Sequence, residues 1–353
     1  MEAGVETGQT LTITRPDDWH LHLRDGAQLA AVAADSARRF ARALVMPNLA
    51  PPILDVAQAG RYRRRILDAL PAETSFQPWM ALYLSEETPL REVARACDSG
   101  FVLGMKYYPA GATTGAEFGV RSPERVYPVL EEMEKRGLPL QVHGELADPE
   151  VDVFSREAFF IERVLLPLLR RFPGLRVVLE HVSTREGVQC VRDGPQLLAA
   201  TITPQHLLLS RNAMFAQGRM RPHHYCLPVP QAEQHRQALI EAATGGHPRF
   251  FLGTDSAPHS RPAKERGCAC AGIYSAHAAV ELYAEVFEAA GRLERLEAFA
   301  AFHGADFYRL PRNGQRLVLH RADWTVPSEL PFGPDTLVPL RAGQPCHWQL
   351  RAA

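Results

Sequence analysis

The sequence has little of what disulfide-stabilised, membrane-spanning or nucleic-acid-binding proteins need. Its 353 residues include six cysteines, too few for a disulfide scaffold in a chain of this length. Its longest apolar runs fall far short of the roughly 20 residues that span a bilayer. The 39 Lys and Arg residues are balanced by 40 Asp and Glu, so there is no general basic field to hold nucleic acid or an acidic membrane. We therefore expect neither a nucleic-acid nor a membrane partner.

The N-terminus also has neither the positive start nor the apolar run of a signal peptide. We therefore expect a cytoplasmic protein with reduced thiols. Hydrophobic residues make up 46% of the chain and charged residues 22%, which is typical of a globular protein and excludes wholesale disorder. A chain of this length buries roughly 75% of its unfolded surface, so its core needs no covalent staples.

Short apolar runs alternate with longer amphipathic segments along the chain. The runs 177–179 and 250–252 are continuous rather than alternating, as in parallel strands covered by helices on both faces. The predicted strands are 11–15 leading to 19–23, 42–47, 76–84, 101–107, 138–143, 175–181, 199–203 and 249–254. The predicted helices are 26–40, 55–70, 89–98, 123–136, 156–172, 184–193, 231–243 and 273–290.

This alternation predicts an α/β protein with a (β/α)₈ TIM barrel, and the runner-up is a doubly wound open sheet. With no repeat or linker to divide it, the chain is predicted to be one domain over 1–353. Residues 1–9 would form an N-terminal tail and 303–353 a segment after the barrel. A last helix is expected near 293–302, and the Pro-rich stretch 325–346 is expected to wrap the surface.

Polar side chains stand at the ends of the predicted strands, where barrel enzymes place their catalytic groups. His20 and His22 are two residues apart, so on a strand both face the same side and can grip one metal ion. Alone this pair is weak evidence. Four more strands end in the same way, with the side chains Lys106, His143, His181 and Asp255.

Lys106 is unusual in such a cluster, because an ammonium group repels cations and cannot ligate them. It could form an ion pair or contact a phosphate. A neutral lysine amine could instead react with carbon dioxide to give an anionic, bridging carboxylate. Sequence spacing does not decide among these roles.

Taken together, these residues resemble the dihydroorotases of the metal-dependent amidohydrolase superfamily, specifically the compact bacterial type. The resemblance covers the chain after its first nine residues, and the full set of motifs in this order is highly specific. The motifs are Pro-Asp-Asp-Trp-His-Leu-His-Leu-Arg-Asp-Gly at 16–26, Met-Pro-Asn at 46–48, Met-Lys-Tyr-Tyr-Pro-Ala at 105–110, Val-His-Gly-Glu at 142–145, Glu-His-Val-Ser at 180–183, Cys-Leu-Pro at 226–228 and Leu-Gly-Thr-Asp-Ser-Ala-Pro-His at 252–259.

The resemblance implies a barrel with two zinc ions at its mouth. His20, His22 and Asp255 would bind the more buried ion, and His143 and His181 the more exposed one. Carboxylated Lys106 and a hydroxide would bridge the two ions. The implied reaction is the reversible hydrolysis of the cyclic amide of dihydroorotate to N-carbamoyl-L-aspartate, the third step of pyrimidine synthesis. Asp255 would be the catalytic acid and base.

The carboxylate of such a substrate needs a cation, and Arg24 lies on the same face of the strand as His22. The resemblance adds Asn48 and His259 to this carboxylate clamp and implies backbone contacts to the ring from Leu227 and Ala271. Residues 109–119 contain three glycines, which marks a mobile loop. In the family this loop closes over substrate with a pair of threonines, here Thr113 and Thr114.

Two alternatives remain. Another cyclic-amide hydrolase, such as a hydantoinase or allantoinase, would share the metals, but hydantoinase substrates need not carry the carboxylate for which Arg24, Asn48 and His259 are suited. A non-catalytic, dihydroorotase-like scaffold subunit would have lost metal ligands, and here every ligand is present. A homodimer is what the resemblance suggests; the residues themselves do not show it.

Overall fold

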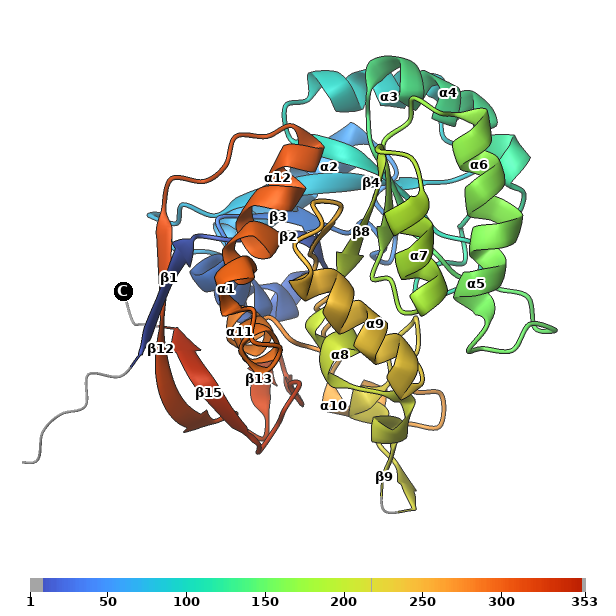
Figure 1. Ribbon diagram of the computed structural model, residues 1–353. Coiled ribbons are helices and arrows are strands. Elements are labelled where there is room, and N and C mark those ends of the chain that lie inside the picture. Colours follow the sequence, from blue (N-terminus) through green and yellow to red (C-terminus); the bar gives the residue numbers. More distant parts are fainter. Residues whose placement is uncertain (1–8, 217, 351–353) are drawn as a thin grey trace, which may run out of the picture.

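Eight parallel strands form the centre of the protein in a computed structural model, which describes residues 9–216 and 218–350 (Figure 1). The strands pair with their neighbours in chain order, as a barrel requires. They are β2 (Asp17–Leu21), β3 (Arg42–Val45), β4 (Gln77–Leu84), β5 (Val102–Tyr107), β6 (Leu140–His143), β7 (Val177–Glu180), β8 (Leu198–Ile202) and β11 (Phe250–Leu252). This confirms the predicted (β/α)₈ TIM barrel over the open sheet.

The last and first strands meet through a short seam rather than a full ladder. The amide of Asp255 donates to the carbonyl of His20 at 2.8 Å, and the amide of His22 donates to the carbonyl of Ser256 at 3.1 Å. These two bonds join the segment after β11 to the end of β2. The seam therefore lies where the predicted metal ligands are.

Helices cover the outside of the barrel, and their ends follow local sequence signals. Asp55 caps one helix by accepting from the amide of Gln58, and Gly137 ends another in the left-handed conformation at φ 70°. The α-helices are α1 (Leu29–Arg39), α2 (Val56–Asp68), α3 (Leu90–Asp98), α4 (Tyr127–Arg136), α5 (Arg156–Phe160), α6 (Leu166–Arg171), α7 (Arg185–Asp193), α8 (Pro204–Leu208), α9 (Glu233–Thr244), α10 (Arg261–Lys264), α11 (Ala279–Ala289) and α12 (His303–Tyr308). Residues Ile161–Leu165 and Ala298–Phe302 are π-helical, and short 3-10 turns span Gly26–Gln28, Pro123–Val126, Arg211–Met214, Pro222–His224 and Leu293–Arg295.

Helix α12 fills the inside of the barrel with aromatic rings. Tyr308 stacks on Trp19 of β2 with ring centroids 4.6 Å apart, and Phe251 of β11 meets Trp19 edge-on. Gly304 makes this approach possible, because a Cβ there would lie 2.0 Å from the indole nitrogen of Trp19. These contacts fix the position of β2 directly beneath the first predicted metal ligand.

The expectation about the N-terminal strand was wrong. The predicted strand 11–15 does not lead into the barrel, because too few residues separate it from β2 for a parallel crossover. It is β1 (Thr10–Thr14), which forms an antiparallel sheet with β12 (Arg316–Thr325) and β15 (Pro345–Leu350). The stretch 325–346, which was expected to wrap the surface, contains the short hairpin β13 (Leu330–Phe332) and β14 (Asp335–Leu337). Its prolines obscure the strand pattern.

The helix predicted at 273–290 begins six residues late, because 273 continues an extended path. Ile273 forms a bridge with Ser256, and its carbonyl accepts from the amide of Ala257. The short hairpin β9 (Phe215–Ala216) and β10 (Arg219–Met220) was not predicted. Most of the predicted N-terminal tail, residues 1–8, lies outside the described residues.

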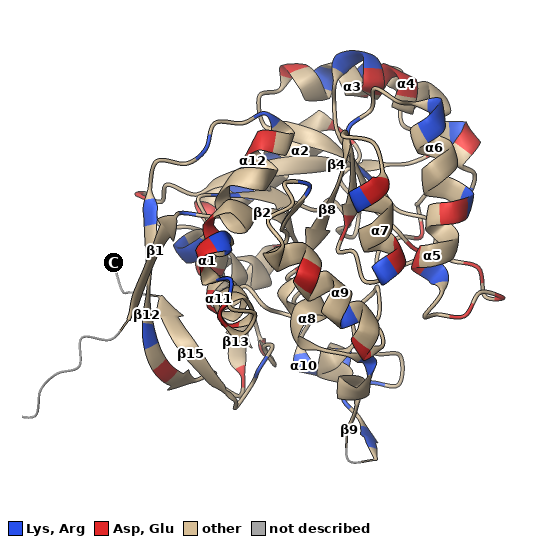
Figure 2. Ribbon diagram, in the orientation of Figure 1, with Lys and Arg blue, Asp and Glu red and all other residues tan. Residues whose placement is uncertain are grey.

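Charged residues of both signs are spread over the outer helices (Figure 2). On α4, Lys135 pairs with Glu131 at 2.9 Å, one turn apart on an exposed face. The mixture of signs agrees with the near-zero net charge of the sequence. Across 9–216 and 218–350, no helix is both long and apolar enough to cross a membrane.

Candidate metal centre and substrate cavity

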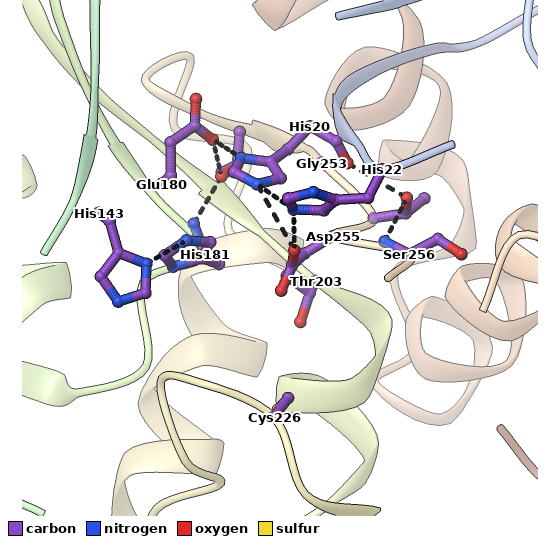
Figure 3. Close-up of polar contacts among 12 residues, drawn as sticks. His20, His22, His143, Glu180, His181, Thr203, Cys226, Gly253, Asp255 and Ser256 are labelled. Carbon is purple, nitrogen blue, oxygen red and sulfur yellow. Dashed lines mark hydrogen bonds and ion pairs between the residues drawn. The ribbon is translucent and has the colours of Figure 1, made fainter. Parts of the chain in front are cut away.

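His20, His22 and Asp255 converge at the barrel seam (Figure 3). His20 Nε2 lies 3.3 Å from His22 Nε2, and Asp255 Oδ1 lies 3.1 Å from His22 Nε2. All three side chains are buried. Two imidazole nitrogens and a carboxylate oxygen that face one point form a donor set that suits a divalent cation.

His143, the last residue of β6, and His181, the residue after β7, form a second group beside the first. His143 Nδ1 lies 3.2 Å from His181 Nε2, and the His181 and His20 rings are 5.0 Å apart between centroids. Burial lowers the pKa of His143 to about 3 and that of His20 and His181 well below the usual value. The imidazoles are therefore neutral, which is the form that binds metal.

Lys106 of β5 is fully buried beside these histidines. Its Nζ has no hydrogen-bond partner among the described residues, and neither has Nδ1 of His181. Burial lowers the pKa of Lys106 to about 8, against the opposing pull of Glu180 and Asp255. A buried nitrogen without a partner is costly. These orphaned atoms fit a site that bound metal would complete.

Three of the metal-site and substrate-site candidates have strained backbones. Arg24, His181 and Asp255 adopt positive φ angles of 58°, 41° and 44°. Residues other than glycine rarely adopt this conformation, and it is concentrated at functional sites. Each of these residues lies within three positions after the end of a barrel strand, where the chain turns at the barrel mouth.

Carboxylates that the sequence analysis did not single out hold the histidines in place. Glu180 Oε2 lies 2.9 Å from His20 Nδ1 and accepts from the hydroxyl of Thr201 at 2.6 Å. Glu145 Oε2 lies 2.8 Å from Nε2 of His143. In both histidines the other ring nitrogen faces the cluster, which is the arrangement that outer carboxylates give to metal ligands. The sequence signal that could have found them is their position: Glu180 directly precedes the candidate ligand His181, and Glu145 follows His143 by two residues.

Asp18 joins the two strands of the seam. Its Oδ1 accepts from the amides of Thr254 at 2.8 Å and His20 at 3.1 Å, and its Oδ2 accepts from the hydroxyl of Thr254 at 2.6 Å. The side chain is fully buried, and burial raises its pKa to about 7. Asp18 therefore fixes the spacing between the histidine pair and Asp255.

Glu157 of α5 has a similar role behind His181. Its carboxylate accepts from the amides and hydroxyls of Ser183 and Thr184, which follow His181 in the chain. A Cβ at Gly187 would lie 2.4 Å from this carboxylate, so α7 needs glycine there. The loop that carries His181 is thus anchored on a buried acid.

A small cavity of about 20 Å³ opens beside the metal centre. It has room for one or two water molecules. Six of the seven predicted substrate-binding residues line it, together with two metal-ligand candidates. The lining residues are His22, Arg24, Asn48, Thr113, Thr114, Leu227, Asp255, Ala257, Ala271 and Gly272.

The seventh, His259, supports the cavity from behind. Its Nε2 lies 3.0 Å from Nη2 of Arg24 and 2.9 Å from the carbonyl of Ala271. Arg24 Nε donates to the carbonyl of Pro258 at 2.8 Å. Within the residues that the structure describes, Arg24 forms no ion pair with a carboxylate. An arginine held by neutral groups at a cavity wall is available for an anionic ligand.

The loop 109–119 closes the cavity. Asn48 Nδ2 donates to the carbonyl of Thr114 at 3.0 Å, and the hydroxyl of Tyr83 donates to the carbonyl of Gly115 at 3.2 Å. Gly115 packs against Asn48 with a φ of 75°, a conformation that favours glycine. A wider groove of about 890 Å³ adjoins the loop and shares Arg24, Asn48 and Thr114 with the cavity. The cavity in this structure is too small for a ring-sized ligand.

Comparison with known proteins agrees with this geometry. The sequence profile of the Amidohydrolase family matches residues 13–325. The dihydroorotase of Laribacter hongkongensis is 61% identical over 342 residues, 97% of this chain and 99% of that protein. The crystal structure of dihydroorotase from Campylobacter jejuni superposes with a TM-score of 0.90 at 34% identity and covers 99% of this chain and 100% of that one.

The dihydroorotase of Saccharomyces cerevisiae, solved in complex with 5-fluoroorotic acid, superposes with a TM-score of 0.89 at 29% identity. That match covers 97% of this chain and 98% of the yeast chain. The similarity thus extends over the barrel, the seam and the C-terminal sheet. The chain belongs to the amidohydrolase family and, within it, to the dihydroorotases.

Proposed function

We propose that this protein is a zinc-dependent dihydroorotase that interconverts dihydroorotate and N-carbamoyl-L-aspartate. One observation carries the proposal: a cluster of neutral, buried imidazoles and Asp255 shares a closed cavity with Arg24, which has no carboxylate partner in the described chain. The cluster suits metal-assisted hydrolysis, and the free guanidinium suits a ring that carries a carboxylate. Family membership supports the same activity.

The donor set fits two zinc ions. His20, His22 and Asp255 would hold one ion, His143 and His181 the other, and carboxylated Lys106 would bridge them. Nitrogen and oxygen donors are those that zinc prefers at catalytic sites. When bound, the ions would supply Lewis-acid activation of water and of the amide carbonyl.

Lys106 is suited to carboxylation because it is buried and its amine is readily neutral. In that reaction the amine nitrogen attacks carbon dioxide, an N–C bond forms and one proton leaves. The lowered pKa of about 8 leaves an appreciable neutral fraction near neutral pH. The product carries a negative charge, which the surrounding imidazoles and metal ions would stabilise.

Asp255 would move the proton of the reaction. It is a metal-ligand candidate and also lines the cavity, so its carboxylate reaches both places. In ring opening it takes a proton from the attacking water and gives it to the leaving ring nitrogen. In ring closure it removes a proton from the carbamoyl nitrogen.

The remaining cavity residues would orient the ring. Arg24, Asn48 and His259 would hold the substrate carboxylate, and the backbones of Leu227 and Ala271 would contact the ring amide. Thr113 and Thr114 would close the lid and exclude water. A hydantoinase substrate needs no carboxylate, so this clamp favours dihydroorotate. Because the structure keeps every candidate ligand, a catalytic role is favoured over a scaffold role.

We also propose that residues 1–353 form one domain, because the family profile runs through the barrel into β12. We further propose a cytoplasmic homodimer, on the family resemblance alone. Sedimentation of the purified protein tests the oligomeric state.

The activity is tested by ring opening of dihydroorotate and ring closure of N-carbamoyl-L-aspartate, followed in the ultraviolet. We expect both reactions, their loss with a chelator and their recovery with zinc. A zinc-loaded protein that converts neither compound would contradict the proposal.

A further inference from the structure

The chain uses lysine sparingly. Three lysines occur in the sequence, and arginine supplies the other 36 of its 39 basic side chains. Lys135 is exposed on α4, whereas Lys106 and Lys264 are buried. Lys106 belongs to the metal centre. Lys264 has no role in the reaction described above, yet it is 3% exposed and ends α10 next to the substrate cavity.

The hydrogen bonds of the Lys264 ammonium group all go to backbone carbonyls, and its Nζ also lies over the Tyr225 ring, 5.6 Å from the centroid. Its Nζ donates to the carbonyls of Tyr225 at 2.8 Å, Cys270 at 2.8 Å and Gly272 at 2.7 Å. It forms no ion pair with any carboxylate in the described ranges. All three of its protons are therefore used, and all three bonds go to two loops rather than to a counter-ion.

Both loops contribute residues to the cavity wall. Leu227 lies two residues after Tyr225, and Ala271 lies between Cys270 and Gly272; both line the cavity. The loops are otherwise joined by a bond from the amide of Gly272 to the carbonyl of Tyr225 at 3.1 Å. A cation at this junction therefore ties together two segments that line the cavity and that are proposed to contact the ring.

The geometry points to Lys264 as a positioning residue for substrate binding, which holds the loops of Leu227 and Ala271 at the separation that fits the substrate ring. This role rests on the proposed function for the identity of the ring. The metal ligands lie elsewhere, so Lys264 would affect binding rather than the chemical step.

A lysine suits this position better than an arginine does. Three carbonyl oxygens converge on one atom, and an ammonium group is a compact centre with three donors. A guanidinium group is planar, and its five donors diverge from different atoms. Burial lowers the pKa of Lys264 to about 8, and the three carbonyls around it accept from the ammonium form.

The test compares Lys264→Met, Lys264→Arg and the control Lys135→Met in the zinc-loaded protein. Kinetics in both directions give kcat and KM, and calorimetry gives Kd for 5-fluoroorotate, the ligand of the yeast dihydroorotase structure. For Lys264→Met we expect KM and Kd to rise at least tenfold, kcat to change less than threefold and zinc content to stay the same. Lys135→Met should match the wild type.

Lys264→Arg separates positioning from charge. Because it cannot satisfy three converging carbonyls, we expect its KM to stay at least fivefold above the wild-type value. Wild-type KM and Kd in Lys264→Arg would show that charge alone suffices and would overturn the role. A folded Lys264→Met with wild-type KM and Kd, and merely a lower melting temperature, would overturn it as well.

Two further outcomes keep the test decisive. If Lys264→Met does not fold, Lys264→Gln takes its place, and an unchanged Kd for 5-fluoroorotate in that variant would refute the positioning role. If the wild type binds 5-fluoroorotate but converts neither substrate, the proposed function fails. The Kd comparison among the variants then still decides the role of Lys264.

Discussion

Replacement of Asp18 by alanine should lower the local stability of the seam more than that of the rest of the barrel. In Asp18→Ala, the buried amides of His20 and Thr254 lose their acceptor, while the hydroxyl of Thr254 can turn to the carbonyl of His20, 3.3 Å away. Each orphaned buried amide costs about 1–3 kcal/mol. The seam should therefore lose about 2–6 kcal/mol of local stability.

Asp18→Asn should cost far less. Both amides donate to Oδ1, which asparagine retains, and its NH₂ group can donate to the hydroxyl of Thr254 in place of Oδ2. Burial raises the pKa of Asp18 to about 7, so loss of the charge costs little near neutral pH. We expect a change below about 1.5 kcal/mol, the net value of one ordinary hydrogen bond.

Hydrogen exchange of peptides covering 16–22 and 250–256 measures this directly, because local opening does not require two-state unfolding. A loss of about 3 kcal/mol speeds exchange by roughly 100-fold. In Asp18→Ala the zinc affinity, measured by competition with a chelator, should fall together with the stability of the seam. The exposed Asp98→Ala is the control. Equal protection in Asp18→Ala and the wild type, or equal damage from alanine and asparagine, would refute the reasoning.

Four other outcomes follow from the site. Asp255→Asn should abolish turnover while zinc stays bound, and substantial residual activity in the metal-loaded variant would argue against its role in proton transfer. Arg24→Met should lower kcat/KM for dihydroorotate by roughly 100-fold or more, since loss of one partner of a buried charge pair costs about 2–5 kcal/mol; a loss below tenfold would place the substrate carboxylate elsewhere. Combined Thr113→Ala and Thr114→Ala should lower turnover at unchanged zinc content, and wild-type kinetics would exclude the lid role. Because the neutral amine of Lys106 prevails above its pKa of about 8, metal-free protein given zinc and a fixed concentration of carbon dioxide should regain activity faster at pH 8.5 than at pH 6.5; the reverse order would contradict carboxylation of this amine.

The sequence predicted the barrel well because its strands are short, apolar and buried on both faces. Continuous apolar runs such as 250–252 are best buried as strands of a parallel sheet that helices cover on both faces. Strand ends place their next residue at the barrel mouth, so His181 and Asp255 could be assigned to one site from their position after an apolar run. The family resemblance added residues such as Asn48 and Ala271, which no local pattern marks and which line the cavity.

What the sequence did not predict depends on contacts between distant segments. The pairing of β1 with β12 joins residues about 300 positions apart, and β12 is amphipathic and interrupted by a register shift near Arg321. The roles of Asp18 and Lys264 depend on carbonyls and amides that only the folded chain brings together. An acid before a histidine motif, or a lysine in a polar loop, reads as a surface charge until its burial is known.

Turnover of dihydroorotate and of unsubstituted hydantoin, with metal content determined on the same sample, decides whether the site is a dihydroorotase site. We expect rapid, chelator-sensitive opening of dihydroorotate alone, with about two zinc ions per chain, as the paired ligand sets imply. Opening of both rings would show that Arg24 and its neighbours do not select a carboxylate. A fully metal-loaded protein that opens neither ring would contradict the account as a whole.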